Sequence, residues 1–411
     1  MNVLNVLYDE RVGGPQMRVI QVARRLRAVG VGTVVAMPKG DPRFSALLDQ
    51  AQIPFCEIEL VRLRSSFNPM EHTRYVAKFC PNVMALRRLI HTHHIDVVHT
   101  NGLMNLQAAI AARMEGTKLV WHLNDVVTPR ALRTLCLPFV LSWADRIAIS
   151  SKAVGRHYFP KPNSTPSRVQ VLYPPVDTEE FRPNAEDSVA RAVRREFGIR
   201  DGCAVIGTVA NIAPGKGFEY LLEAAPSIKQ RFPDTTFLFI GQKLANRQAY
   251  WDFLARRIKE LKLAKDVYFT GGRSDVSRLI RAMTLYVHPS ESESCGMSIL
   301  EASASGLPVV AADVDGPHET VLPNVTGLLV EPKRPLRFAE AIIRLLADPE
   351  SARRMGMAGS ERMRALFSLD SCVKEHMRLY TALVPGKKAA VRSELSSPGA
   401  PEQWIDVYTR N

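Results

Sequence analysis

Short apolar runs alternate with segments of helical periodicity along the first half of the chain. Residues 3–7 form the first run, a loop with two glycines follows, and apolar positions then recur at helical spacing up to Gly30. Further apolar runs at 33–37, 95–99 and 119–122 predict more strands. Strands that alternate with helices predict a parallel sheet covered by helices on both faces.

The second half repeats this alternation after a break that is rich in proline. Its apolar runs predict strands at 204–209, 237–240, 267–270, 285–288 and 309–312, with helical patterns between them. We therefore predict an α/β fold of two Rossmann-like, doubly wound domains that face each other across a cleft. Ligands of such sheets bind at the carboxyl ends of the strands, so we expect the ligand in that cleft.

The break and the C-terminal end of the chain set the expected domain boundaries. We place an N-terminal domain at 1–172, a linker at 173–184 and a C-terminal domain at 185–366. A final helical pattern covers 367–385. The polar segment 386–411 contains Pro, Gly and Ser, and we expect it to be disordered.

The charge of the chain is unevenly distributed. The formal net charge is +13, and residues 1–185 hold 23 Lys and Arg against 14 Asp and Glu, an excess of nine. Such asymmetry indicates an anionic partner, which could be a membrane surface, a nucleic acid or a charged substrate, or else a merely soluble basic surface. Six scattered cysteines form no CxxC pair, which argues against a zinc site and fits a reducing cytoplasm.

The sequence shows no signal for secretion or for a membrane span. The N-terminus lacks a basic region and a long apolar region. The apolar stretch 135–144 is too short to cross a bilayer. We therefore expect a soluble or peripheral protein.

Two glutamates, Glu293 and Glu301, stand eight positions apart where a strand leads into a helix. The loop between them includes Gly296, and we expect the helix to begin at about Met297. Free backbone N–H groups at a helix N-terminus attract phosphate, and glycine allows close approach. A carboxylate at Glu301 can accept both hydroxyls of a ribose, while Glu293 can reach another part of the same nucleotide. Alternatively, one is an acid favoured by the helix dipole and the other a solvated loop residue.

Three further strand ends carry weaker signals. Lys216 precedes a helix, where it can neutralise a diphosphate or simply be solvated, and Gly217 after it excludes a P-loop. Gly13 and Gly14 permit backbone approach to phosphate or sugar, or only a tight turn. His122 can face the cleft, although a lone histidine is more often structural.

These motifs, in this order, resemble the retaining glycosyltransferases of family 4, which have the GT-B fold. Glu293 and Glu301 match the acid–x7–acid motif of that family within the segment PSESESCGMSILEASASGLPVV. GKG at 215–217, VLYPPVDTEEF at the linker, the N-terminal GG loop and GPHE at 316–319 also match. The resemblance covers roughly residues 1–383.

The resemblance implies a site for a nucleotide-diphosphate sugar, mainly on the second domain. Glu301 would hold the ribose, and Glu293 would contact the sugar ring. Backbone around Gly296, Met297 and Ser298 would bind phosphate or sugar hydroxyls. The acceptor hydroxyl would attack the face that the nucleotide leaves, so the anomeric configuration would be retained.

The resemblance also implies roles outside this segment. Lys216 would stabilise the leaving diphosphate, and His122 would line the sugar side, so catalytic roles would fall on these two residues and on Glu293. Gly13 and Gly14 would close over the diphosphate. The helix at 367–385 would cross back onto the first domain.

The resemblance also places the loop with Arg273 near the base of the nucleotide. The sequence departs from the family at Asn211, which stands where the family often has an arginine as a second diphosphate cation. The segment 313–315 spells DxD, the metal motif of a different glycosyltransferase fold. We expect neither a metal nor any cofactor beyond the nucleotide-sugar co-substrate.

The acceptor is expected to contact the first domain. Residues 61–93 hold six basic residues and one acid with interleaved apolar positions, namely Arg62, Arg64, Arg74, Lys78, Arg87 and Arg88, Glu71, and Phe67, Met70, Tyr75, Val76, Phe79 and Met84. The apolar stretch 132–143 follows Arg130 and Arg133. Basic and apolar residues together suit an anionic membrane surface. We therefore predict a cytoplasmic enzyme, peripheral on the inner face of the membrane, that acts on a lipid-linked or cell-surface glycan in polysaccharide biosynthesis. A helix pair packed in the core with a solvated basic edge is the alternative.

Other functions remain open on the sequence. A sugar-nucleotide epimerase or a phosphorylase could share the fold, and a non-catalytic nucleotide-sugar binder would keep Glu301 without turnover. The low aromatic fraction of 7% and the lack of a recognisable nucleic-acid-binding motif argue against a nucleic-acid partner.

Overall fold

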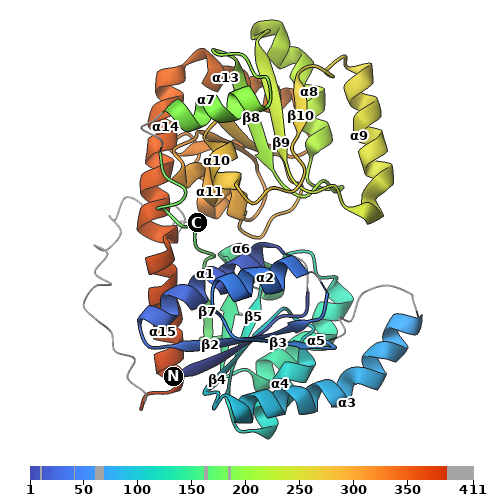
Figure 1. Ribbon diagram of the computed structural model, residues 1–411, viewed down its shortest axis with the longest axis vertical. Helices are drawn as coiled ribbons and strands as arrows, with labels where there is room; N and C mark the ends of the chain where they lie inside the picture. The colour runs from blue at the N-terminus through green and yellow to red at the C-terminus, as the bar shows by residue number, and fades with distance from the viewer. Residues whose placement is uncertain (10–11, 41, 61–68, 162–164, 184–186, 387–411) are drawn as a thin grey trace. The chain divides into compact units, whose positions relative to one another are not determined.

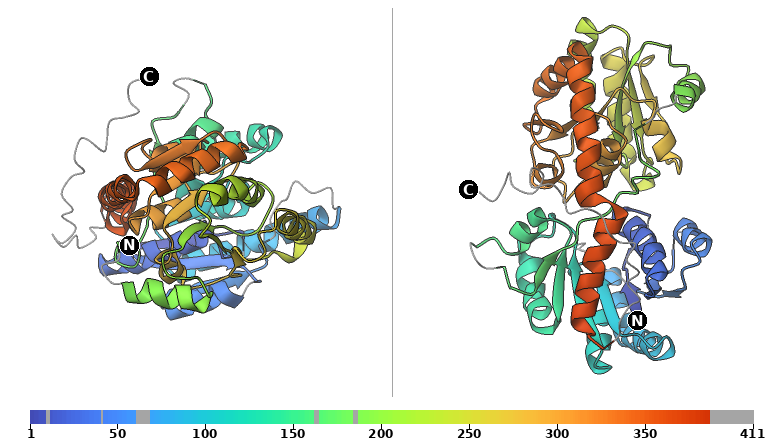
Figure 2. Two further views of the ribbon diagram at one scale, coloured as in Figure 1. Left: turned by 90° about the horizontal axis from the view of Figure 1, so that it is seen from above. Right: turned by 90° about the vertical axis from the view of Figure 1, so that its left-hand side faces the viewer.

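The computed structural model describes residues 1–9, 12–40, 42–60, 69–161, 165–183 and 187–386 (Figure 1). The chain divides into two compact units. The N-terminal unit comprises Met1–Pro175 and the segment that begins at Leu369, and the C-terminal unit comprises Val176–Ser368. Helices cover both faces of the sheet in each unit (Figure 2).

The N-terminal unit is built on a parallel sheet of seven strands in the order β3-β2-β1-β4-β5-β6-β7. The strands are β1 (Asn2–Val6), β2 (Gly32–Pro38), β3 (Phe55–Ile58), β4 (Val97–Asn101), β5 (Lys118–Leu123), β6 (Arg146–Ile149) and β7 (Val169–Val171). Every pairing is parallel. The strand order reverses between β1 and β4, so the loops that follow these two strands diverge and leave room for a ligand.

The helices of this unit pack on the sheet through alternate residues of each strand. Leu4 and Val6 face a core shared with α3 (Pro69–Thr92), α4 (Leu106–Met114) and α5 (Arg130–Trp143). Val3 faces the opposite side, where α1 (Gly14–Ala28) and α15 (Leu369–Leu383) pack. The remaining helices are α2 (Pro42–Gln50) and α6 (Lys152–Tyr158). This alternation follows from the period of two along a strand.

The C-terminal unit repeats the topology with six parallel strands in the order β10-β9-β8-β11-β12-β13. The strands are β8 (Ala204–Val209), β9 (Thr235–Ile240), β10 (Val267–Phe269), β11 (Leu285–His288), β12 (Val309–Ala312) and β13 (Gly327–Val330). The helices are α7 (Asp187–Glu196), α8 (Phe218–Arg231), α9 (Gln248–Glu260), α10 (Val276–Ile280), α11 (Met297–Ala304), α12 (Pro317–Thr320), α13 (Pro335–Ala347) and α14 (Pro349–Arg362), with a 3-10 turn at Ala245–Arg247 and a π-helical turn at Met363–Phe367. Here the order reverses between β8 and β11.

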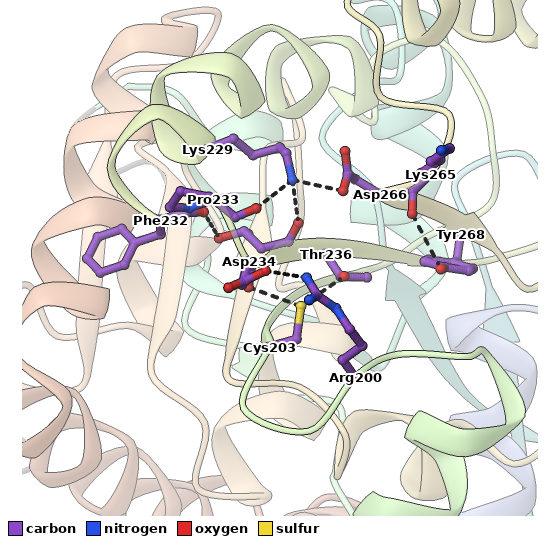
Figure 3. Close-up of polar contacts among 11 residues, drawn as sticks. Arg200, Cys203, Lys229, Phe232, Pro233, Asp234, Thr236, Lys265, Asp266 and Tyr268 are labelled. Atoms are coloured by element: carbon purple, nitrogen blue, oxygen red, sulfur yellow. Dashed lines mark hydrogen bonds and ion pairs between the residues drawn. The ribbon is translucent and has the colours of Figure 1, made fainter.

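Polar contacts at the amino ends of these strands stabilise the edge opposite the carboxyl ends (Figure 3). The Nζ of Lys229, near the end of α8, donates to the carbonyl oxygen of Pro233 at 2.8 Å and to the carboxylate of Asp266 at 2.8 Å. The thiol of Cys203 donates to the carbonyl oxygen of Asp234 at 3.0 Å. These contacts connect the last turn of α8 and the residue before β8 to the loops that enter β9 and β10, which is a structural role.

The prediction of two parallel α/β sheets is confirmed. The predicted strand at 95–99 lies at Val97–Asn101 instead, and β3, β6, β7 and β13 were not predicted. These four strands are only three or four residues long, which leaves little periodic signal. Residues 61–68 and 387–411 lie outside the described ranges. Within those ranges, no helix combines the length and apolar character needed to cross a bilayer.

Candidate donor-sugar site

The loops that follow β8 and β11 meet at the point where the strand order of the C-terminal sheet reverses. The backbone N–H of Glu291 donates to the carbonyl oxygen of Gly215 at 2.9 Å. Gly217 has φ +74°, and a Cβ there would lie 2.1 Å from the carbonyl oxygen of Pro289. Only glycine therefore fits this position, which begins α8 and fixes the loop that carries Lys216.

Lys216 and Glu293 form an ion pair between these two loops. The Nζ of Lys216 lies 3.2 Å from the Oε2 of Glu293, and the Nε2 of His288 lies 3.3 Å from the same oxygen. Burial by itself raises the pKa of Glu293, but the adjacent His288 and Lys216 outweigh it and lower the pKa to about 2. Glu293 is therefore a carboxylate at neutral pH, and the ammonium group of Lys216 lies beside it.

The N-terminus of α11 begins beside this pair. Gly296 has φ +81° at the N-cap position, and no side chain caps the helix. The first helical residues are Met297 and Ser298, whose Oγ accepts a hydrogen bond from the Tyr286 hydroxyl at 2.7 Å. An uncapped helix start presents backbone N–H groups and the positive end of the helix dipole, which suits an anion.

Glu301 lies one turn further along α11. Burial, with a smaller contribution from Glu180, raises the pKa of its carboxyl to about 8. Among the described residues, no side chain forms a hydrogen bond or ion pair with this carboxyl. A half-buried acid without a partner next to an uncapped helix start is the arrangement that a ligand with hydroxyl donors would satisfy.

The other two predicted donor residues of this unit differ in their surroundings. Asn211 is exposed in the loop after β8. The guanidinium of Arg273 lies 2.7 Å from Asp275 and 2.9 Å from Glu196, and hydrogen bonds to these carboxylates raise the pKa of Arg273. Arg273 is thus already paired with two acids of its own unit.

A cavity of about 320 Å³ opens next to Glu293. It is lined by Glu291, Ser292, Glu293, Asp313, Val314, Asp315 and His318. The carboxylate of Asp313 contacts the imidazole Nε2 of His318. Within the part of the chain that the structure describes, no three His, Cys, Asp or Glu residues are grouped as metal ligands. The cavity offers polar groups to a molecule bound beside Glu293.

His122, predicted for the sugar side, lies in a buried polar chain of the N-terminal unit. Its Nε2 accepts from the Nη1 of Arg18 at 2.8 Å, because an arginine can only donate. The neutral ring then carries its proton on Nδ1, which lies 3.0 Å from the Nε2 of His99. Burial lowers the pKa of both histidines well below the usual value. Both nitrogens of His122 are therefore engaged inside the protein.

The same chain reaches α15. The Nδ1 of His99 lies 2.6 Å from the hydroxyl of Tyr380. Arg18 also donates to the side-chain oxygens of Asn101 and of Asn124. Sequence reasoning missed Arg18, although its position four residues before Val22 on the apolar side of α1 indicated burial.

Gly13 and Gly14 lie at the start of α1, after β1. Gly13 is the extended N-cap residue, and its carbonyl oxygen accepts from the N–H of Met17 at 3.0 Å. No side chain caps this helix. The predicted residues thus form two groups. His122 and the two glycines belong to the N-terminal unit, and the others belong to the C-terminal unit.

Comparisons with known proteins place both units in one class of enzyme. Residues 189–362 match the family described as glycosyl transferases group 1, and residues 12–180 match glycosyltransferase family 4. Together the two matches span most of the chain. The protein is a glycosyltransferase, and the chain belongs to family 4, as the sequence motifs predicted.

Individual relatives agree with this assignment. The D-inositol 3-phosphate glycosyltransferase of Corynebacterium urealyticum is 28% identical over 331 residues, 75% of this chain and 76% of that protein. The protein of the same name from Frankia alni is 29% identical over 407 residues, 92% of this chain and 96% of that protein. The crystal structure of Anabaena HepE in complex with UDP and glucose has a TM-score of 0.80 at 23% identity, covering 93% of this chain and all of that chain. This last likeness shows the GT-B fold.

Proposed function

We propose that the protein is a retaining glycosyltransferase that moves a sugar from a nucleotide-diphosphate sugar to an acceptor hydroxyl without a metal. The observation that carries the proposal is the Lys216–Glu293 pair beside the uncapped start of α11, with the unpartnered Glu301 one turn away. These groups offer a cation for a diphosphate, backbone N–H groups for its oxygens and a carboxylate for ribose hydroxyls.

The spacing of these groups suits one nucleotide. Glu301 lies four residues after Met297, which is about 6 Å along a helix axis at 1.5 Å per residue. Adjacent ribose and diphosphate groups are separated by a comparable distance. In this arrangement Lys216 stabilises the charge that develops on the leaving diphosphate, and Met297 and Ser298 bind phosphate through their backbone.

The sugar would lie beside Glu293, next to the cavity of about 320 Å³. A carboxylate there accepts hydrogen bonds from sugar hydroxyls, and its low pKa keeps it ionised. His122 does not reach the sugar in this proposal, because Arg18 and His99 occupy both of its ring nitrogens. Asn124, whose side-chain oxygen accepts from Arg18, offers an amide N–H at the same strand end.

For the acceptor, we propose a lipid-linked or cell-surface glycan, with the enzyme acting in the cytoplasm in polysaccharide biosynthesis. The basic N-terminal half supports an anionic acceptor. The names of the relatives from Corynebacterium and Frankia support D-inositol 3-phosphate as a second candidate, which is also an anion.

Calorimetry with UDP, GDP and ADP, each with and without Mg²⁺, tests the donor site. The HepE complex makes UDP the first choice. We expect one nucleotide to bind without metal, and Glu301→Ala to weaken it by roughly ten- to a hundredfold, since charge-assisted hydrogen bonds contribute about 1.5–3 kcal/mol. Glu340→Ala, which removes an acid of a surface ion pair on α13, is the matched control.

Turnover separates the proposal from its rivals. A transferase forms product only when donor and acceptor are both present, whereas an epimerase converts the donor alone and a binding protein converts nothing. NMR of the product anomeric proton distinguishes retention from inversion. Activity that disappears in EDTA and returns with Mg²⁺ would contradict the metal-independent mechanism.

A further inference from the structure

The helix α5 exposes an apolar face to solvent. The side chains of Leu135 and Phe139 are one helical turn apart and are 64% and 39% exposed, and Pro138 is exposed beside them. Val127, just before the helix, is 70% exposed. Leu135, Pro138 and Phe139 are three and four positions apart and share one face of the helix, and we call these three residues the α5 surface. They are large or rigid apolar groups where a solvated helix normally has polar ones.

The opposite face of α5 holds the helix firmly on its sheet. Cys136 and Val140 are buried in the core that α3, α4 and α5 share on one side of the sheet (Figure 1). Trp143 packs against the same core, and its ring centroid lies 5.2 Å from that of Phe139. The outward residues are therefore not needed to attach the helix.

Arginines line both ends of the helix. No acid occurs between Asp125 and Asp145. Arg130 is exposed in the first turn, and Arg133 donates to the carbonyl oxygen of His157. At the last turn, Arg168 donates to the carbonyl oxygen of Ala144 at 3.2 Å, and Arg113 donates to that of Trp143.

Two basic side chains of α3 have closer acidic partners than Arg113 at the end of α5, which lies 3.8 Å from Asp145. On α3, Lys78 forms an ion pair with Glu59, and Arg87 forms one with Glu115. These carboxylates come from outside the helix and neutralise part of the charge that the sequence indicated for residues 61–93. Arg62, Arg64 and Phe67 lie outside the described residues.

We propose that the α5 surface docks on an anionic lipid bilayer. The apolar side chains would enter the boundary between headgroups and acyl chains, and the arginines at both helix ends would contact lipid phosphates. Phe139 and Trp143 form an aromatic pair of the kind that favours a membrane–water interface. This goes beyond the proposed transferase reaction, because docking requires neither a donor nor turnover.

A second copy of the chain is a less suitable occupant. A two-fold dimer through this face would place the same patch on both sides of the interface. The arginines of both copies would then approach one another with no acid on either helix between Asp125 and Asp145. An anionic bilayer complements the same charges.

Vesicle co-sedimentation of the full chain tests the proposal. The probes are phosphatidylglycerol–phosphatidylcholine vesicles and pure phosphatidylcholine vesicles at low and moderate salt. The chain should bind the anionic vesicles, and the double variant Leu135→Asp, Phe139→Asp should lower the partition coefficient by about tenfold or more, because it removes the inserted groups and adds two negative charges.

A matched pair of substitutions separates docking from general attraction to a basic protein. Leu336 and Val325 of the C-terminal unit are 65% and 48% exposed, so Leu336→Asp, Val325→Asp changes the net charge equally. The partition coefficient of the control variant should fall by about threefold or less. Equal losses in both variants, or no binding by the unmodified chain, would overturn the proposal.

A second measurement keeps apolar side chains on the α5 surface and so does not depend on weakening vesicle binding. Leu135→Trp places a fluorophore on the α5 surface, and brominated acyl chains should quench it, while Leu336→Trp should stay unquenched. If both stay unquenched, the α5 surface does not enter the bilayer. A dimer in light scattering that Leu135→Asp, Phe139→Asp converts to a monomer would assign the face to a second copy instead.

Discussion

The Nζ of Lys216 lies 3.2 Å from the Oε2 of Glu293, and this contact joins the loops that follow two neighbouring strands, β8 and β11. The two residues are 77 positions apart in the chain. The pair keeps a cation and a carboxylate side by side in the C-terminal unit before any substrate binds. A diphosphate would then meet a lysine already positioned by Glu293.

The low pKa of Glu293 makes the stability of the protein sensitive to acid. The folded pKa of about 2 lies below the unfolded value of 4.5, so the unfolded state binds more protons between these values. The stabilisation is present above pH 4.5 and is lost as the pH falls towards 2. Urea unfolding at several pH values should show that the free energy of unfolding of Glu293→Gln falls less steeply with decreasing pH. Glu350→Gln, from an exposed pair with Arg354, should behave like the unmodified chain.

The raised pKa of Glu301 predicts that nucleotide binding releases a proton. At pH 7 a carboxyl with a pKa of about 8 is mostly protonated, whereas ribose hydroxyls favour the ionised form. Calorimetry in buffers of different ionisation enthalpy should therefore report about one proton released per nucleotide. Affinity should rise between pH 6.5 and 8.5, and Glu301→Gln should remove both effects. Equal proton release in the variant would show that another group titrates.

Alanine substitutions at Gly217 and Gly215 allow a matched comparison of two positions in the loop that carries Lys216. Their φ angles are +74° and +80°, so alanine costs roughly 1–2 kcal/mol of backbone strain at either position. Only at Gly217 would the added Cβ meet Pro289, because nothing lies within 4 Å at Gly215. Gly217→Ala should lose a further 1–3 kcal/mol or so in chemical unfolding and lower kcat. Similar losses in both variants would argue against the close approach.

Three histidines that lie buried in the described part of the N-terminal unit predict a second pH effect. Burial lowers the pKa of His376 to about 4, and those of His99 and His122 also lie well below 6.5. The unfolded state therefore binds more protons between about pH 4 and 6.5, and the free energy of unfolding rises with pH in this window. His376→Gln should reduce the slope of the free energy of unfolding against pH, by an amount that corresponds to at most about one proton. The partly exposed His93, changed to Gln, is the control.

Local pattern was enough to predict most elements and the outline of the donor site. Apolar runs and helical spacing identified most of the central strands, because a strand or helix must bury one face whatever its partners are. The Gly217 turn and the spacing of Glu293 and Glu301 around the start of α11 are likewise local features. The motif order around them was sufficient to indicate family 4.

Only the tertiary structure decided which of these residues meet. His122 looked like a lone histidine at a strand end, yet Arg18, 104 positions away, and His99 engage both of its nitrogens. Strand order brings such residues together, and no local period encodes that order. The sequence by itself therefore determined the two α/β units and the residues at their strand ends. The packing of α1 and β4 around β5 decided that His122 is buried, and the neighbouring positions of β8 and β11 decided that Lys216 pairs with Glu293.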